Sequence, residues 1–165
     1  MKNKSLTWWH CALIFIVANA ISFLPAGFNG DEAFYNRFRQ PTIAPPDWLF
    51  APMWAFLNIT SLIGLYIVAN KPKDTPGRRA VINLEIVGWV LFALFSPLYF
   101  GLRSPVLGAV VTVIGLVVVI ATCMKSYPIS KKAFWLFFLR LLWLLLASYV
   151  SVWVALHNGD EFFNK

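Results

Sequence analysis

Five long apolar stretches constrain this chain more than any other feature of its sequence. They are joined by one long connection, residues 25–46, and three short ones, and they occupy residues 7–24, 47–69, 78–100, 104–125 and 132–157. A helix needs about 20 apolar residues to cross the hydrocarbon core of a bilayer. Because lipid offers no hydrogen-bond partner to open backbone, each stretch is predicted to be an α-helix.

The composition agrees with a membrane protein. Hydrophobic residues make up 59% and charged residues 13% of the chain, whereas a soluble domain is nearer half apolar and a quarter charged. The apolar runs are too continuous for the alternating pattern of an outer-membrane barrel. We therefore expect an all-α, polytopic membrane protein. Because no internal repeat or second domain is recognisable, residues 1–165 should form a single five-transmembrane-helix bundle. Short loops make sequential helices antiparallel neighbours.

The first stretch has a second interpretation. Lys2 and Lys4 precede an apolar run that reaches Ala18-Asn19-Ala20, as in a cleavable signal peptide. The apolar run continues for four more residues, so we expect a retained helix.

Basic residues predict the orientation. Nine lie at the N-terminus or in the even-numbered connections (Lys2, Lys4, Lys71, Lys73, Arg78, Arg79, Lys125, Lys131, Lys132), and four lie on the other side (Arg37, Arg39, Arg103, Lys165). Positive loops stay in the cytoplasm, which places the N-terminus there and the first loop and C-terminus outside, most simply at the cell membrane. The basic residues form no continuous stripe, so nucleic acid is not an expected partner.

Cysteine and histidine give no metal or haem site. Cys11 and Cys123 fall inside apolar runs, where a thiol packs as a small hydrophobe. His10 and His157 fall near opposite ends of the chain and, with five spans, on opposite membrane faces. A hydrocarbon core of about 30 Å would separate them, so they cannot ligate one iron together.

Prolines and tryptophans crowd the start of the second stretch, "PPDWLFAPMW" (residues 45–54). Pro45 and Pro46 suit the first turn of a helix, and Trp48 falls at interface depth. Pro52 is predicted to lie inside the helix and to kink it at the carbonyl of Trp48, opening space beside Trp54. The alternative is a lipid-facing ring and a tolerated membrane proline.

This stretch resembles the start of the second helix in the TspO/MBR family of tryptophan-rich sensory proteins and translocator proteins. "LFALFSPLYFG" (residues 91–101) is similar to the family's third-helix end, and "LLWLLLASYVSVW" (residues 141–153) resembles its fifth helix. The resemblance covers essentially the whole chain. It implies a five-helix membrane protein, usually dimeric, that binds porphyrins or haem-like tetrapyrroles and, in some members, sterols and synthetic isoquinoline ligands.

Several positions depart from the family's pattern. Polar or tryptophan residues of the family are replaced here by Gln40, Ile43, Asn58, Phe92, Phe95 and Ser151. The matching positions that remain are Trp54, Ser96, Trp143, Ala147 and Tyr149. The scaffold is therefore expected to be retained, while part of the polar lining has become phenylalanine.

The predicted topology brings the three stretches to one depth beneath the first loop. An aromatic cavity there would stack a flat macrocycle. The expected ligand-binding residues are Phe34, Trp54, Asn58, Phe92, Phe95, Ser96, Trp143, Ala147, Tyr149 and Ser151. Phe34, Tyr35, Arg37 and Arg39 form a candidate lid whose arginines could pair with propionates. The alternative is an amphipathic loop lying in the membrane interface.

Three classes of function follow from the resemblance. The first is a membrane protein that binds a tetrapyrrole or related hydrophobic ligand as sensor, scavenger or transporter and requires no cofactor. The second is an enzyme for oxidative or light-dependent porphyrin breakdown, with Trp54 and Trp143 as redox-active groups, although no acid–base pair or activated nucleophile is recognisable. The third is a partner-binding membrane protein with a degenerate site.

Small residues in the fourth stretch suggest self-association. Ser104 and Gly108 form a small-xxx-small pair, followed by Gly115, and such residues let helix backbones approach closely. Together with the resemblance they predict a homodimer that Gly108→Leu would disturb. Close packing within one chain is the alternative.

Glu85 and Arg140 are the only charges deep within the predicted spans. They lie seven and eight residues past the starts of two parallel helices, hence about 10–12 Å deep in each. An unpaired charge at the bilayer centre costs about 2.5–3.5 kcal/mol or more on insertion scales. We therefore expect them to pair below the cavity; the alternative is that Arg140 snorkels to the interface while Glu85 is protonated.

Overall fold

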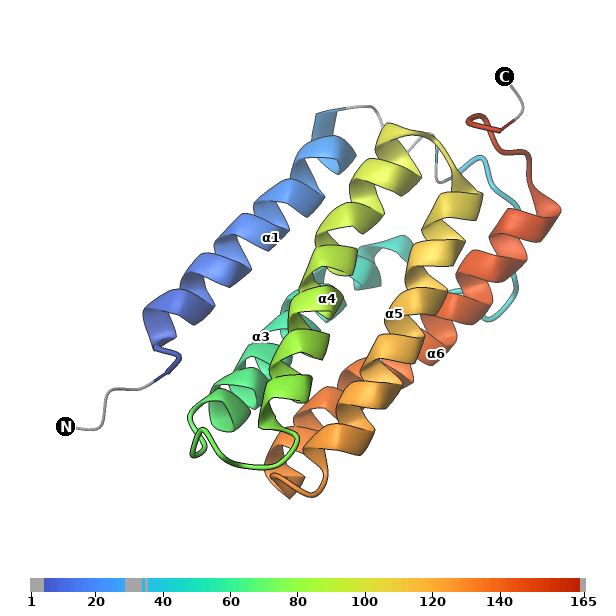
Figure 1. Cartoon of the computed structure of the whole chain (residues 1–165). Helices are drawn as coiled ribbons and strands as arrows, with labels where there is room; N and C mark the ends of the chain where they lie inside the picture. The colour runs from blue at the N-terminus through green and yellow to red at the C-terminus, as the bar shows by residue number, and fades with distance from the viewer. Residues whose placement is uncertain (1–4, 29–33, 35, 164–165) are drawn as a thin grey trace.

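The computed structural model of the chain describes residues 5–28, 34 and 36–163. Five long helices run through it, with no strand in the described part: α1 (Trp8–Phe28), α3 (Phe50–Ala69), α4 (Arg78–Ser96), α5 (Pro105–Ser126) and α6 (Lys131–His157). A short 3-10 helix, η1 (Asp47–Leu49), leads into α3, and a π-helical turn, η2 (Pro97–Gly101), prolongs α4 (Figure 1). The all-α prediction is confirmed.

Within the residues that the structure describes, four helical segments are long and apolar enough to cross a membrane. They are α3 with η1, α4 with η2, α5 and α6, and α1 adds a shorter apolar stretch over Trp8–Phe23. The chain is an integral membrane protein.

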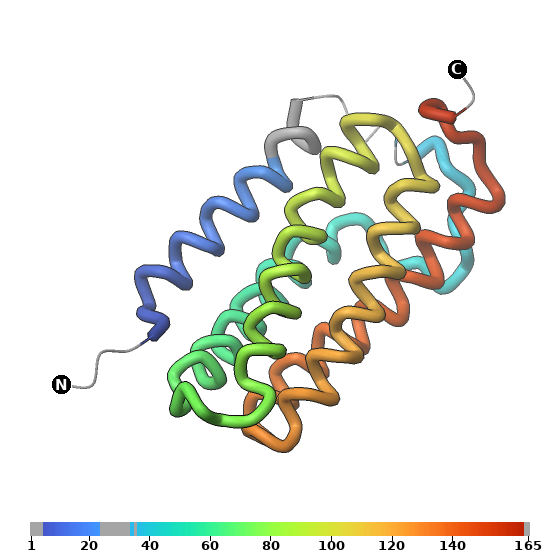
Figure 2. Tube along the Cα trace, viewed as in Figure 1, coloured from blue at the N-terminus to red at the C-terminus, as the bar shows by residue number. Residues whose placement is uncertain are grey.

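The helices form two layers. One layer contains α1, α4 and α5, and the other contains α3 and α6 (Figure 1). α6 packs against both α5 and α3, whereas α1 packs mainly against α4. We call the end of the bundle with the α4–α5 turn and the C-terminus the loop end and the opposite end, where α1 begins, the base (Figure 2).

Two apolar clusters hold the layers together. One joins α3, α4, α5 and α6 and includes Val68, Val81, Cys123, Ala133 and Phe137. The other joins α1, α3 and α4 and includes Cys11, Ala18, Leu62, Leu65 and Trp89. Both cysteines are free thiols and 4% exposed, which confirms their prediction as packing residues.

The structure places Pro52 near the start of a helix, and the predicted kink itself stays a prediction. Residues 47–49 form the separate 3-10 helix η1, so Pro52 falls in the first turn of α3, which begins at Phe50. The backbone N–H groups of a first helical turn have no intrahelical partner, and proline therefore loses no hydrogen bond there.

The small residues of α5 pack within the chain. A Cβ atom on Gly108 would lie 2.3 Å from the Tyr99 ring of η2, so only glycine fits against this ring. Ser104 is fully buried and caps α5, accepting a hydrogen bond from the Leu107 N–H at 3.1 Å. Gly108 therefore does not face another molecule, and its assignment to a dimer interface is wrong. The homodimer itself stays a prediction.

Candidate ligand-binding cavity

A cavity of about 1000 Å³ lies between the two layers, in the loop-end half of the bundle. This volume is at the upper end of the usual range for small-molecule sites, about 300–1,000 Å³. All five long helices contribute to its wall, and so do η1, η2 and the end of the first loop at Pro45 and Pro46. The three sequence stretches that resemble the TspO/MBR family thus meet at one cavity.

Aromatic rings form much of the wall. Trp54 of α3 lies 5.3 Å from Phe92 of α4, centroid to centroid, and Trp143 of α6 lies 5.6 Å from Phe50 in an edge arrangement. These residues all line the cavity. Their flat apolar faces suit a planar hydrophobic ligand, because offset stacking and edge contacts are favourable between aromatic systems.

Seven of the ten sequence-predicted site residues line this cavity. They are Trp54, Phe92, Phe95, Ser96, Trp143, Ala147 and Ser151. Their convergence follows from three helix ends that meet at the same depth. Whether they contact a ligand stays a prediction.

The other three predicted site residues lie outside the lining. Asn58 is fully buried behind it, where it accepts a hydrogen bond from Arg140. Phe34 is 3% exposed and packs edge-on against Phe38 and Tyr99. Tyr149 is 54% exposed on the outer surface of α6, because its neighbour Ser148 is the residue that faces inward.

The sequence analysis did not identify the polar residues that α1 contributes to the cavity wall. Asn19 and Ser22 line the cavity, and the Ser22 hydroxyl is 3.0 Å from that of Ser96 on α4. The two residues are three apart and hence on one face of the helix. Their spacing in an otherwise apolar span was the available signal, since polar side chains in membrane helices tend to face other helices.

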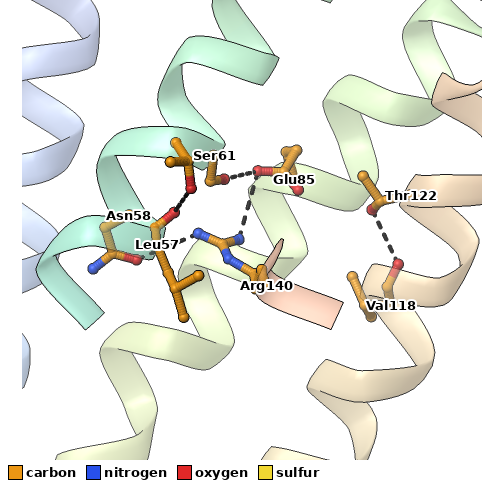
Figure 3. Close-up of polar contacts among 8 residues, drawn as sticks. Leu57, Asn58, Ser61, Glu85, Val118, Thr122 and Arg140 are labelled. Carbon is orange, nitrogen blue, oxygen red and sulfur yellow. Dashed lines mark hydrogen bonds and ion pairs between the residues drawn. The ribbon is translucent and has the colours of Figure 1, made fainter. Parts of the chain in front are cut away.

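The base-facing end of the cavity is charged. Glu85 of α4 and Arg140 of α6 both line it, with Arg140 Nη1 3.6 Å from Glu85 Oε2. The predicted pairing of these two residues is confirmed. The Ser61 hydroxyl donates to the same Glu85 oxygen, and Arg140 Nη2 donates to Asn58 Oδ1 at 3.3 Å (Figure 3). This polar cluster connects α3, α4 and α6. It is buried, since Glu85 is 1% and Arg140 is 5% exposed.

At the loop end, the C-terminal tail (residues 158–163) packs over the bundle. The Arg39 N–H donates to Asn158 Oδ1 at 2.8 Å, and Asn158 Nδ2 donates back to the Arg39 carbonyl at 3.1 Å. Glu161 pairs with Arg103 at 3.2 Å and with Arg37 at 3.7 Å. Arg37 and Arg39, which were expected to form a lid, are therefore joined to the tail and do not line the cavity. Tyr35 lies outside the described residues.

Asp160 is the centre of the tail's attachment. Its Oδ2 accepts from the Ser104 hydroxyl at 2.7 Å and from the Val106 N–H at 3.0 Å, and its Oδ1 accepts from the N–H groups of Phe162 and Phe163. Burial alone would raise the pKa of Asp160, but these hydrogen bonds outweigh burial and hold its pKa below the ordinary value. The carboxylate also lies at the N-terminus of α5, where negative charge is favourable.

One side of the cavity reaches the surface of the bundle. Phe23 of α1 and Trp48 of η1 line the cavity and are 71% and 73% exposed. At the base, the residue Leu6 just before α1 is hydrogen-bonded to Asn70 at the end of α3, which holds the two helices together there. The exposed rim, between α1 and η1, lies instead at the loop end, and a hydrophobic molecule could reach the cavity through it.

Comparison with known proteins settles the family. The sequence profile of the TspO/MBR family matches residues 11–156. This chain belongs to the TspO/MBR family. This TspO/MBR protein is 31% identical over 160 residues to the tryptophan-rich protein TspO of Chlorobaculum tepidum. The alignment covers 92% of this chain and 95% of the relative. It is 30% identical to the tryptophan-rich protein TspO of Archaeoglobus fulgidus (87% and 97% covered) and 28% identical to the translocator protein of Bos taurus (78% of each chain).

The described part of this TspO/MBR protein holds no group of three His, Cys, Asp or Glu side chains placed to bind a metal ion. His10 is near the start of α1 at the base, and His157 ends α6 at the loop end (Figure 1). The two imidazoles therefore cannot bind one metal together, as their positions in the sequence predicted.

Proposed function

We propose that this TspO/MBR protein binds a flat hydrophobic ligand of the tetrapyrrole class in the cavity, acting as a sensor, scavenger or transporter. The observation that carries the proposal is the convergence of the three family-like stretches on one aromatic cavity of about 1000 Å³. The exposed rim at Phe23 and Trp48 supports it, because a ligand dissolved in the membrane would have a side approach.

A titration with protoporphyrin IX tests the proposal. The purified protein in lipid nanodiscs is titrated in the dark and under light, and both tryptophan fluorescence and pigment absorbance are followed. Quenching that saturates with no loss of pigment supports binding. Light-dependent loss of pigment that disappears without Trp54 or Trp143 supports the enzymatic alternative, and the absence of any response supports a partner-binding protein.

The tryptophan rings of the cavity should matter individually. Trp54→Ala and Trp143→Ala each remove a ring from the wall, where an aromatic contact contributes about 0.5–1.5 kcal/mol beyond its buried area. We expect each variant to weaken protoporphyrin binding by about tenfold. Trp8→Ala is the matched control, because Trp8 stacks on Tyr66 at the base, outside the cavity. Equal affinities for all three variants would place the ligand elsewhere.

A further inference from the structure

The charged end of the cavity has hydrogen-bond donors that the protein does not satisfy. A guanidinium has five N–H donors. Arg140 donates one hydrogen bond, from Nη2 to Asn58 Oδ1, and its contact with Glu85 is an ion pair at 3.6 Å. Arg140 Nε is buried without a hydrogen-bond partner. Leaving such a group unpaired costs about 1–3 kcal/mol or more, since it has lost its water.

A second unsatisfied donor lies beside it. Trp143 follows Arg140 by three residues on α6, so both side chains project from one face of the helix. Its indole Nε1 is buried without a partner, and the side chain is 8% exposed. Both residues line the same cavity. Two unsatisfied donors, one of them cationic, are therefore buried in residues that line an otherwise mostly apolar cavity.

We propose that this end of the cavity recognises the carboxylate of an apolar acid, which enters with its acidic group directed toward the base. Arg140 and Trp143 would donate to the carboxylate oxygens, and the aromatic wall would hold the apolar body. The inference rests on the proposed function in that it assumes the cavity to be the ligand site. Charge-assisted hydrogen bonds from arginine to carboxylate are among the strongest in proteins.

The placement of the other cations supports this orientation. Among the described lining residues Arg140 is the only Lys or Arg. Arg37 and Arg103 at the loop end both pair with Glu161. A ligand acid directed toward the loop end would compete with that pairing, whereas one directed toward the base meets donors without partners.

Glu85 sets the strength of this site. Glu85 Oε2 already forms an ion pair with Arg140 and accepts a hydrogen bond from Ser61. A ligand carboxylate would therefore share the guanidinium with Glu85. Removing the charge of Glu85 should therefore strengthen acid binding. Removing the charge of Arg140 should abolish the preference for an acid. The two substitutions are predicted to act in opposite directions.

The test compares acids with their neutral esters. Protoporphyrin IX and its dimethyl ester form one pair, and a nitroxide-labelled stearic acid and its methyl ester form the other, because the source of the carboxylate can be a tetrapyrrole or a fatty acid. Each is titrated by tryptophan quenching into nanodisc-embedded protein. We expect the wild type to bind at least one acid about tenfold more tightly than its ester and Glu85→Gln to widen that ratio.

Three further variants complete the test, and the first is chosen so that it leaves no lone buried charge. The double variant Glu85→Gln/Arg140→Gln replaces a buried ion pair by two neutral amides of similar size, so no lone charge is left buried, and it should bind acid and ester equally. Trp143→Phe retains an aromatic ring without the N–H and should reduce the acid preference by a few fold. Arg79→Gln removes one positive charge from an exposed residue at the base, outside the cavity, and should leave the ratio unchanged.

The outcomes separate this inference from the proposed function. If acid and ester bind the wild type equally, the carboxylate site is wrong while the tetrapyrrole function stands. If neither tetrapyrrole binds but the fatty acid preference depends on Arg140, the tetrapyrrole function is wrong while the carboxylate site stands. Absence of binding for both pairs overturns both.

Discussion

Two polar clusters connect elements that are distant in the sequence, and they differ in how completely they are satisfied. At the loop end, both oxygens of Asp160 accept two hydrogen bonds each, from Ser104, Val106, Phe162 and Phe163. In the cavity, Arg140 has one hydrogen bond, an ion pair and a donor without a partner. Both side chains are 5–6% exposed.

This difference suits the Asp160 cluster to attaching the tail and the Arg140 cluster to binding a ligand. A carboxylate whose acceptor sites are filled by its own chain has little capacity left for a ligand, so Asp160 fastens the tail to α5. A buried guanidinium with spare donors next to a cavity can accept another group at low cost, because its desolvation is already part of the folded state. Two equally buried charged side chains therefore differ in capacity: Asp160 has its acceptor sites filled, whereas Arg140 keeps donors that a ligand could use.

The largest expected effect comes from breaking the cavity pair. Arg140→Leu leaves Glu85 charged and unpaired, which should destabilise the protein by about 3–5 kcal/mol, whereas Glu85→Leu/Arg140→Leu should cost much less. Thermal melting of the four members of this double-mutant cycle in one detergent measures the coupling. Additive losses would show that the 3.6 Å contact carries no energy.

Asp160→Asn should have a smaller effect. Asparagine retains one carbonyl oxygen, but its NH₂ group would meet the Val106 N–H or the Ser104 hydroxyl, so at least one buried donor loses its acceptor. We expect a loss of about 1–3 kcal/mol, visible as a lower melting temperature and faster hydrogen exchange at Val106.

Glu161→Gln is the matched control for Asp160→Asn. Glu161 is 45% exposed at its side chain, and exposed ion pairs contribute about 0–1 kcal/mol. If this substitution destabilised the protein as much as Asp160→Asn, the distinction between a satisfied buried carboxylate and an exposed one would not hold.

The smallest effect is a dependence on pH. Because the pKa of Asp160 is lowered in the folded protein, its stabilisation is complete above the unfolded value of about 3.9 and is lost as the pH falls through the folded value. The difference in melting temperature between wild type and Asp160→Asn should be constant from pH 7 to about 5 and narrow below about pH 4. A difference that widened on acidification would contradict the sign of this pKa shift.

Part of the candidate site could be predicted because it depends on depth alone. Glu85 and Arg140 lie at matching distances from the starts of two parallel helices, and lipid makes an unpaired charge costly, so their pairing followed from counting residues. The same counting placed Trp54, Phe92 and Trp143 at one level, where they line one cavity.

Rotation about the helix axis could not be predicted. A membrane helix is apolar on both its lipid-facing and its protein-facing sides, so hydrophobic periodicity does not tell which side faces inward. For this reason Tyr149 was assigned to the cavity although it is exposed, and Asn58 was assigned to the wall although it lies behind it.

By itself, the sequence determined that this chain is a five-helix membrane protein of the TspO/MBR family, because run length, charge distribution and local motifs are properties of the linear chain. Only the tertiary structure decided that α1 packs mainly on α4, that Gly108 accommodates Tyr99, and that Asp160 fastens the tail to α5. These features depend on residues 9 to 74 positions apart in the sequence meeting at particular angles and distances. No local pattern encodes such contacts, because their energy exists only once the helices are packed.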